Sequence, residues 1–241
     1  MKYILSIDQG TTSSRAILFD AKMNLHLKSQ IEFDQIYPKS GWVEHSGDDI
    51  WSTTIATCKD VLRKASIKSE DVVSIGITNQ RETTLVWDKI SGDPIYNAIV
   101  WQDRRTSEFC DKLKSNGHEV EIKEKTGLLV DPYFSASKLR WMLENVDGAR
   151  ERAKKGELLF GTVDTYLIWK LTEGKSHKTD ATNASRTMLY NIKKGCWDAE
   201  LCALFDIPMD MLPEVMDCAA NFGVTTLLGG TIPILGVAGD Q

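Results

Sequence analysis

The sequence predicts an α/β domain with a mixed sheet and flanking helices, on two observations. Three short apolar or alternating segments, Tyr3–Ile7, Arg15–Phe19 and Leu25–Phe33, follow one another with tight connections, which is typical of an antiparallel meander. A helical segment and then a strand rich in β-branched residues, Val72–Ile77, come next. This order fits an α/β domain and differs from a Rossmann unit, which begins with a strand, a glycine-rich turn and a helix.

The helix is expected from Ile50 to Ala65, because apolar residues recur there about every 3.6 positions. Ser46, with Asp49 close behind it, resembles a capping box at its start. The other expected elements, in chain order, are strands Thr84–Trp87 and Ile95–Val100, a polar helical region from Asp103 to about Lys155, strand Leu158–Phe160, a helix capped by Thr162 and ended by Gly174, and a last strand from Thr231. The last strand runs into a functional motif instead of a closing element, so a further domain is expected to follow.

Composition and charge exclude several classes of protein. Hydrophobic residues make up 42% of the 241 residues and charged residues 26%, as in ordinary globular proteins. The net charge of -5 argues against nucleic acid or an anionic membrane as a main partner, because either needs a basic face. No apolar run is long enough to span a bilayer. The five cysteines form no CxxC pair, which favours free thiols in a reducing cytoplasm.

The strongest local motif is Asp8–Arg15, a polar turn between the first two expected strands. It has the features of a phosphate-binding hairpin: Asp8 can hold Mg²⁺ through water, Gly10 lets the backbone approach closely, and Arg15 adds a permanent charge. Further amide and hydroxyl donors to phosphate oxygens come from Thr11, Thr12 and Ser13. The alternative is a plain polar β-turn. Neither GxxxxGK[ST] nor GxGxxG occurs, so a Walker loop is excluded.

Two charged residues, Arg81 and Glu82, follow the strand Val72–Ile77 within the segment Thr78–Thr84. Side by side they supply hydrogen-bond donors and acceptors. A small polyol needs both, because each of its hydroxyls donates and accepts. The segment is thus a candidate polyol contact, although residue type alone favours the alternative, a solvated charged turn.

Two aromatic residues and a second carboxylate complete the candidate site. Trp101 can form an apolar wall against a carbon backbone, and Tyr133 can offer its phenol to a hydroxyl. The alternatives are a core tryptophan and an aromatic anchor for a helix that Ser135 caps. Asp240, bounded by glycine after the last expected strand, suits a general base toward a hydroxyl. The alternative for Asp240 is an Asx turn.

Taken together, five segments resemble the N-terminal domain of the glycerol kinases, which belong to the FGGY carbohydrate kinases within the actin/hexokinase/Hsp70 ATPase superfamily. They occur in order, with compatible spacing and over the whole chain, and they are Asp8–Arg15, Asn79–Thr84, Trp101–Arg105, Asp131–Lys138 and Gly239–Gln241. Asn79–Thr84 discriminates best, because pentulose kinases of the same family look different there.

The resemblance implies an RNase H-like fold in which residues 1–241 form the substrate-binding domain, with a C-terminal ATP-binding domain absent from this chain. The residues that it implies for hydrogen bonding to glycerol are Arg81, Glu82, Tyr133, Asp240 and Gln241. It implies that Trp101 packs on the carbons of glycerol and that Asp240 takes the proton of the attacking hydroxyl. Asp8 would help to hold Mg²⁺. The contacts that it implies for the ATP phosphates are Thr11, Thr12, Ser13 and Arg15.

The implied reaction is the ATP- and Mg²⁺-dependent phosphorylation of glycerol to sn-glycerol 3-phosphate in glycerol catabolism, by in-line transfer of the γ-phosphoryl group. A cytoplasmic enzyme that forms a homodimer or tetramer is expected. One alternative is another FGGY sugar kinase. A second alternative is a polyol-binding fragment without catalytic activity of its own, because the adenosine pocket of this family lies largely in the other domain.

Overall fold

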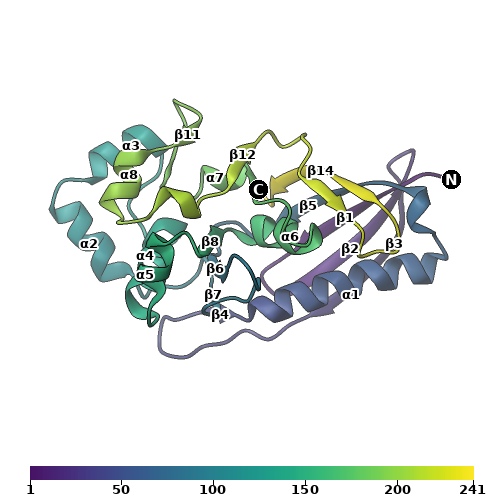
Figure 1. The fold of residues 1–241 in the computed structure, drawn as a ribbon, viewed down its shortest axis with the longest axis horizontal. Coiled ribbons are helices and arrows are strands. Elements are labelled where there is room, and N and C mark those ends of the chain that lie inside the picture. Colours follow the sequence, from purple (N-terminus) through teal and green to yellow (C-terminus); the bar gives the residue numbers. More distant parts are fainter.

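A mixed sheet forms one side of the molecule. The computed structural model describes residues 1–241, and its main sheet has six strands (Figure 1). In spatial order they are β13 (Gly223–Thr225), β14 (Ile232–Gly239), β5 (Val72–Asn79), β1 (Tyr3–Gln9), β2 (Ser13–Asp20) and β3 (Leu25–Glu32). β1, β2 and β3 form an antiparallel meander, and β5 is parallel to both of its neighbours, β1 and β14. The mixed sheet that the sequence predicts is confirmed.

Three parallel strands end in one row. In the register of the sheet, Gln9 at the end of β1 and Gly239 at the end of β14 are both paired with Asn79 at the end of β5. Ligands of open α/β sheets bind outside the carboxyl ends of parallel strands. The segments that leave Gln9, Asn79 and Gly239 therefore meet at the edge where a ligand site is expected.

One hydrophobic core lies between the sheet and two helices, α1 (Gly47–Ala65) and α6 (Val163–Leu171). It contains 27 buried residues, including Leu5 of β1, Ile50 of α1 and Leu167 of α6. Side chains alternate across a strand, so the buried residues of β1 fill this core while their neighbours along the strand stay half-exposed. Because of this alternation, the first strands could be predicted from their pattern of apolar residues.

The two helices begin differently from each other. Ser46 caps α1 as predicted, because its Oγ accepts a hydrogen bond from Asp49 N at 3.1 Å. Thr162 stands at the N-cap position of α6, but its side chain makes no capping bond. Its hydroxyl donates instead to the buried carboxylate of Asp164. The expected capping bond of Thr162 is therefore absent: its hydroxyl is turned toward the Asp164 carboxylate and accepts nothing from the first turn of α6.

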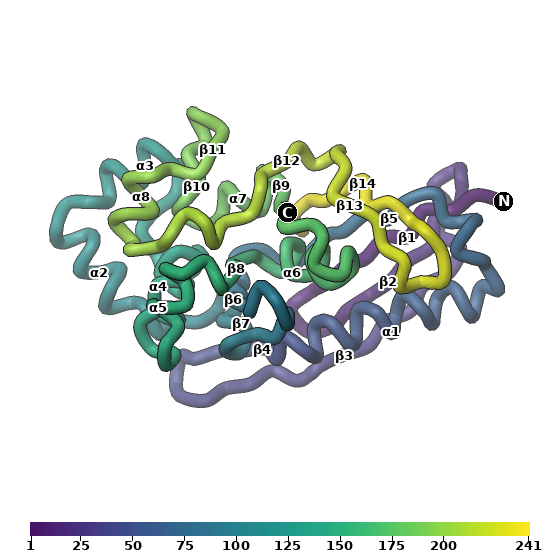
Figure 2. Tube along the Cα trace, in the orientation of Figure 1, coloured from purple at the N-terminus to yellow at the C-terminus, as the bar shows by residue number.

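A second hydrophobic core of 23 buried residues lies beside the sheet (Figure 2). Its helices are α2 (Ser107–Ser115), α3 (Glu119–Thr126), α4 (Ser135–Asn145), α5 (Ala149–Lys154) and α8 (Ala199–Leu204). The two-stranded sheet of β6 (Leu85–Asp88) and β8 (Leu158–Gly161) joins the two cores. Trp87 of β6 belongs to the first core and Val86 to the second. Both sides of this ribbon are therefore buried.

Short elements complete the chain. They are β4 (Glu44–His45), β7 (Ala98–Ile99), β9 (Lys178–Asp180), α7 (Ala181–Ala184), β10 (Tyr190–Asn191), β11 (Cys196–Trp197), β12 (Glu214–Met216) and the 3₁₀ turns Ser69–Asp71 and Met209–Met211. The strand expected over Ile95–Val100 is shorter than predicted, since only Ala98–Ile99 pairs with β4. No helix has the length and apolar character needed to cross a bilayer.

The cap of α1 supports a stability prediction. Replacing Ser46 with alanine leaves Asp49 N without its acceptor, so Ser46→Ala should lower the free energy of unfolding by about 1 kcal/mol in urea titrations. Ser52→Ala, on the exposed side of the same helix, is the control and should change it by less than about 0.5 kcal/mol. Equal effects of the two substitutions would contradict the capping role.

Candidate active site

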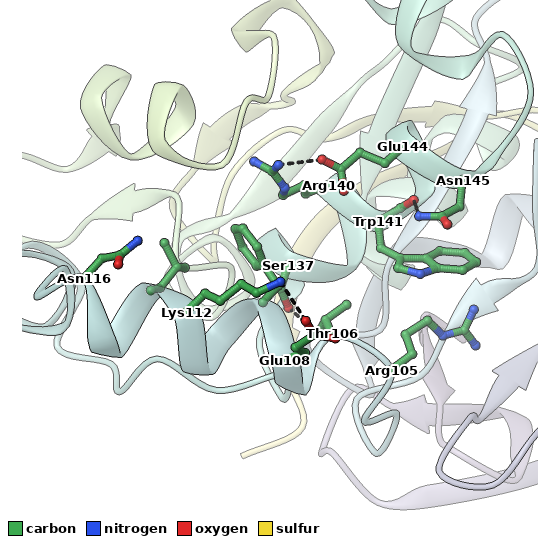
Figure 3. Close-up of a pocket in the computed structure, with 12 residues that line it drawn as sticks. Arg105, Thr106, Glu108, Lys112, Asn116, Ser137, Arg140, Trp141, Glu144 and Asn145 are labelled. Carbon is green, nitrogen blue, oxygen red and sulfur yellow. Dashed lines mark hydrogen bonds and ion pairs between the residues drawn. The ribbon is translucent and has the colours of Figure 1, made fainter.

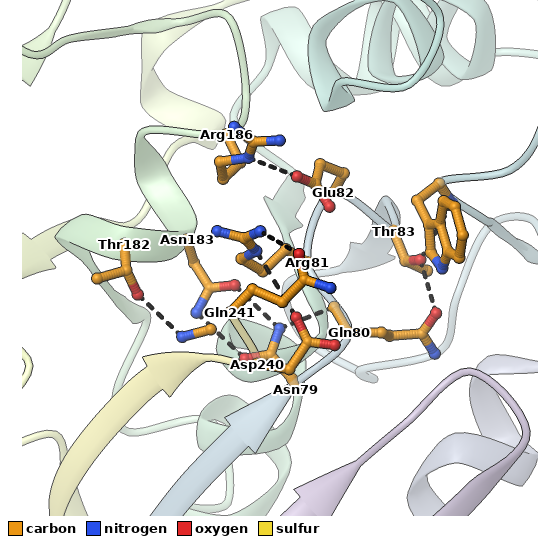
Figure 4. Close-up of polar contacts among 12 residues, drawn as sticks. Asn79, Gln80, Arg81, Glu82, Thr83, Thr182, Asn183, Arg186, Asp240 and Gln241 are labelled. Carbon is orange, nitrogen blue, oxygen red and sulfur yellow. Dashed lines mark hydrogen bonds and ion pairs between the residues drawn. The ribbon is translucent and has the colours of Figure 1, made fainter.

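A small polar cavity lies at the row of strand ends. It has a volume of about 80 Å³. The eight residues that line it are Thr11, Gln80, Arg81, Glu82, Trp101, Tyr133, Asp240 and Gln241. Six of these are the residues that the sequence predicts for substrate binding, and the hairpin residue Thr11 is a seventh from the predicted set. The structure thus brings together residues that lie far apart in the sequence (Figure 4).

Asp240 is held beside Arg81 at the end of β14. Its backbone N donates to Asn79 O at 3.2 Å, and its Oδ1 lies 3.6 Å from Arg81 Nε. Arg81 Nη2 also donates to Gln241 Oε1 at 3.4 Å. A Cβ at Gly239 would stand 2.3 Å from Arg81 Cδ. Glycine is therefore needed at this position, because the Arg81 side chain passes directly over the backbone before Asp240.

Glu82 occupies a strained and buried position. Its φ is 62°, a left-handed conformation that a residue with a Cβ seldom adopts. The carboxylate accepts a hydrogen bond from Arg186 Nε at 2.6 Å. Burial raises the pKa of Glu82, and the ion pair with Arg186 opposes this rise. Ser135 Oγ donates to the backbone oxygen of Glu82 at 3.0 Å, so Ser135 fixes this turn and does not cap α4, contrary to the alternative that the sequence left open.

Two aromatic rings close one side of the cavity. The ring centroids of Trp101 and Tyr133 are 5.5 Å apart, with planes inclined by 57°. Trp101 Nε1 donates to Thr11 Oγ1 at 3.1 Å, which fixes the indole against the hairpin. Burial raises the pKa of the Tyr133 phenol, so the hydroxyl keeps its proton for donation. The two rings together offer an apolar surface, on which the Tyr133 hydroxyl is a hydrogen-bonding group.

The turn that carries Tyr133 is organised by a buried lysine. Lys138 Nζ donates to Tyr133 O at 2.6 Å, to Phe134 O at 3.0 Å and also to Pro132 O. Burial lowers the pKa of Lys138 to about 7, yet three carbonyl acceptors favour the ammonium, because a neutral amine has only two N–H donors. Sequence reasoning assigned no role to Lys138.

The residues of the β1–β2 hairpin that are predicted to contact phosphates differ in how accessible they are. Arg15 Nη1 and Asp8 Oδ2 form an ion pair at 2.9 Å. Thr12 is exposed, whereas Ser13 is buried and its Oγ accepts a hydrogen bond from Gln30 Nε2 at 3.1 Å. Thr11 lines the cavity. In this conformation Thr12 is the most accessible hydroxyl of the hairpin.

The hairpin and the Arg81–Glu82 turn are joined by amide groups. Gln80 N donates to Gln9 O at 2.8 Å, and Gln80 Nε2 donates to Gly10 O at 3.2 Å. His45 Nδ1 lies 3.3 Å from Gln80 Nε2, and burial lowers the pKa of His45 to about 4, which keeps the ring neutral near pH 7. These bonds fix the distance between the hairpin and the cavity.

Behind the cavity lies a buried polar network that the sequence analysis missed. The amides of Asn79 and Asn183 exchange hydrogen bonds of 3.0 and 3.1 Å. Asp180 Oδ1 accepts from Asn183 Nδ2 at 2.7 Å, and Thr182 Oγ1 accepts from Gly239 N at 2.9 Å. The network therefore ties α7 to the ends of β5 and β14. Its only sequence signal is the run of polar residues after β9.

The acidic, histidine and cysteine side chains are too dispersed to enclose a metal ion by themselves. No cluster of three or more histidine, cysteine, aspartate or glutamate side chains occurs that could enclose a metal ion. Asp8 is half-buried and stands at the end of β1 as a single carboxylate beside the hairpin. Mg²⁺ commonly uses one or two carboxylates together with water and substrate phosphates. Asp8 therefore fits such a shared site.

Three other cavities are larger than this one, and the two largest have similar volumes. A cavity of about 580 Å³ between α2 and α4 contains none of the predicted site residues (Figure 3). Another of about 580 Å³ includes Tyr133, Phe134 and Arg186, and Tyr133 is the residue that it shares with the small cavity. Size alone therefore does not identify the site; the convergence of strand ends and paired charges does.

The family is decided by a match over nearly the whole chain. Residues 3–241 match the FGGY family of carbohydrate kinases, N-terminal domain. The chain belongs to this family. It is 65% identical to the glycerol kinase of Roseobacter denitrificans over 100% of the chain and 49% of that protein. It is 61% identical to glycerol kinase 1 of Pseudomonas aeruginosa over 99% of the chain and 49% of that protein.

Solved structures agree with the predicted fold. The Plasmodium falciparum glycerol kinase with ADP superposes with a TM-score of 0.95 at 35% identity, over 100% of this chain and 49% of that one. A xylulose kinase from Lactobacillus acidophilus has a TM-score of 0.88 at 24% identity, over 100% and 48%, and supports the fold alone. The RNase H-like fold expected for this FGGY domain is thereby confirmed. The chain spans about half the length of the curated relatives that it matches.

The buried carboxylate of Asp164 predicts a pH dependence. Burial and the nearby Asp180 raise the pKa of Asp164 to about 7. An unfolded aspartate loses its proton near pH 4, so between about pH 4 and 7 the folded state loses stability as the pH rises. Asp164→Asn removes this loss. Its free energy of unfolding relative to the original protein should rise by at least about 1 kcal/mol between pH 5 and pH 8 in urea titrations.

Asp20→Asn is the control for this pH series. Asp20 lies at an exposed turn where hydrogen bonds from Asn24 lower its pKa, so it stays ionised between pH 5 and pH 8. Its relative stability should stay constant from pH 5 to pH 8. A constant difference for Asp164→Asn as well would contradict the proposed protonation of Asp164.

The close approach at Gly239 predicts a steric effect. Gly239→Ala would push against the Arg81 side chain and should destabilise the fold by about 1–3 kcal/mol in urea titrations. Gly76→Ala, in the neighbouring strand, meets nothing nearer than Gly236 O at 4.0 Å. It should be neutral or stabilise by up to about 1 kcal/mol. Similar results for both substitutions would mean that Arg81 moves aside freely.

Proposed function

We propose that this chain is the substrate-binding half of an ATP-dependent glycerol kinase, which converts glycerol into sn-glycerol 3-phosphate. Residues 1–241 form the N-terminal domain, and a C-terminal domain supplies the ATP-binding pocket. The proposal is supported by the identity to glycerol kinases and by the fact that the relatives are about twice as long. The observation that carries it is the cavity of about 80 Å³ in which two carboxylates, an arginine and two aromatic rings converge.

The cavity offers what a three-carbon polyol needs. Arg81 donates hydrogen bonds, Glu82 and Asp240 accept them, and the Tyr133 phenol can do either. Gln241 adds an amide beside Arg81. Trp101 packs its ring against the carbon atoms, where hydroxyl groups would find no partner. The matched donors and acceptors favour glycerol over an apolar or anionic ligand.

Asp240 acts as the general base. It is 43% exposed at the mouth of the cavity, and the arginine beside it keeps it oriented. A carboxylate within hydrogen-bond reach of a primary hydroxyl accepts the proton as the oxygen attacks the γ-phosphorus. The attacking oxygen forms the new P–O bond, the bond to the β-phosphate oxygen breaks, and ADP leaves.

The hairpin handles the phosphates. Thr11, Thr12 and Ser13 provide hydroxyl and backbone N–H donors, and Arg15 provides charge close to Asp8. Asp8 would hold Mg²⁺ through water. When bound, the ion neutralises charge on the phosphates during transfer. The amide bonds of Gln80 keep the hairpin in register with the polyol cavity, which suits a reaction governed by positioning.

A different FGGY sugar kinase remains the alternative activity. The small cavity favours a three-carbon substrate over a pentulose, and the identity of 60–65% is to glycerol kinases. A cytoplasmic enzyme that forms a homodimer or tetramer is part of the same proposal. All five cysteines are free, which is compatible with a reducing compartment.

The test is a coupled ADP-release assay on the full-length protein. Asp240→Asn should lower kcat for glycerol by about two to four orders of magnitude, because the base is lost while the side chain keeps its shape. Asp111→Asn, on the exposed face of α2, should leave kcat within twofold. Residues 1–241 alone should release no glycerol-dependent ADP. Faster turnover of a pentulose than of glycerol would overturn the choice of substrate.

A further inference from the structure

Arg186 lies directly behind the cavity without lining it. It belongs to the loop between α7 and β10, 104 residues after Glu82 in the sequence. Arg186 Nε donates to Glu82 Oε1 at 2.6 Å, and the side chains are 26% and 2% exposed, respectively (Figure 4). A hydrogen-bonded charge pair with one partner fully buried is stronger and better oriented than a surface ion pair.

The same guanidinium also packs against the aromatic wall. Its Cζ lies 4.9 Å from the ring centroid of Phe134 and 5.8 Å from that of Tyr133. Arg186 lines the neighbouring cavity of about 580 Å³, which shares Tyr133 with the polyol cavity. Of the three side chains that Arg186 contacts, Glu82 and Tyr133 line the polyol cavity, so Arg186 can act on a bound polyol through these two.

The other cations near Glu82 are occupied elsewhere. Arg81 turns toward Asp240 and Gln241, and the three protons of Lys138 point at backbone carbonyls. Arg186 is therefore the side chain that hydrogen-bonds the Glu82 carboxylate, through Oε1. No side chain donates to Glu82 Oε2, which leaves that oxygen for a ligand hydroxyl.

We propose that Arg186 is a positioning residue for polyol recognition: it holds Glu82 Oε1 so that Oε2 accepts from a substrate hydroxyl, and it supports the Tyr133 ring from behind. The inference rests on the proposed function, because it concerns the same site. Arg186 makes no contact with the nucleotide hairpin. Its influence is therefore confined to the polyol side of the reaction.

A pH signature separates this role from a merely structural one. The titratable and charged groups that face Glu82 are Arg81, Tyr133, Lys138 and Arg186. Burial raises the pKa of Glu82, and Arg186 is the foremost opposing influence. Without Arg186, Glu82 takes up its proton at a higher pH, loses its negative charge and becomes a much weaker acceptor for a substrate hydroxyl. The acid limb of kcat/KM for glycerol should then move to higher pH.

The experiment compares Arg186→Gln with the original full-length enzyme at several pH values. We expect kcat/KM for glycerol at pH 7 to fall by about tenfold or more, mostly through KM, with KM for ATP within twofold. Arg186→Lys keeps the charge and should recover part of the loss. If Arg186→Gln fails to fold, the same measurements are made on Arg186→Lys. The matched control is Arg140→Gln: Arg140 is 25% exposed, pairs with Glu144 and lies 4.5 Å from the Phe109 ring, away from the site (Figure 3).

A double-mutant cycle decides whether Arg186 acts through Glu82. In a Glu82→Gln background, Arg186→Gln should lower kcat/KM for glycerol by no more than about twofold further. Additive losses, an unshifted acid limb or an equal rise in KM for ATP would each overturn the inference. If the original enzyme releases no ADP with glycerol, the proposed function fails. If it does and the Arg186 variants match it, the inference alone fails.

Discussion

The parallel register of β1, β5 and β14 is the constraint on which the site depends. It places Gln9, Asn79 and Gly239 in one row, so that three loops from distant parts of the sequence leave the sheet together. A slip of one residue would turn every side chain of a strand to the opposite face. The apolar core beneath the sheet therefore fixes the positions of the carboxylates as firmly as it fixes the fold. The same strand register is therefore required for core packing and for the site.

Polar groups inside the protein add the specificity that apolar packing lacks. The mutual bonds of Asn79 and Asn183 satisfy both amides while joining α7 to the strand ends. Buried polar groups are costly unless they are paired, so such a network tolerates few alternative arrangements. Lys138 has the same character in the turn of Tyr133, since three carbonyls converge on one ammonium. Both sets of hydrogen bonds restrain loops of the site, the first at the strand ends and the second at the Tyr133 turn.

The sequence predicted the strands and α1 because these depend on local patterns, whereas the full set of residues that the cavity brings together, Gln241 included, came from the family resemblance. Arg81, Glu82 and Asp240 follow apolar strands, and strand ends can be recognised by periodicity and turn residues. Arg186 and Asn183 were missed, since their partners lie 104 residues away and nothing local reveals such contacts. Ser135 was expected at most to cap a helix. Its bond to Glu82 O depends on the left-handed turn of Glu82, which no propensity indicates.

The paired charges explain how two carboxylates share so small a cavity. Like charges at close range favour protonation of one of them, and that group would become a weaker hydrogen-bond acceptor. Here each carboxylate has its own cation, Arg81 beside Asp240 and Arg186 beside Glu82. The four formal charges cancel, which suits an uncharged polyol. The two carboxylates differ in burial, since Glu82 is 2% and Asp240 43% exposed, and this difference suits the proposed roles: Glu82 would hold a ligand hydroxyl, whereas Asp240 would accept the proton of the attacking hydroxyl at the mouth of the cavity.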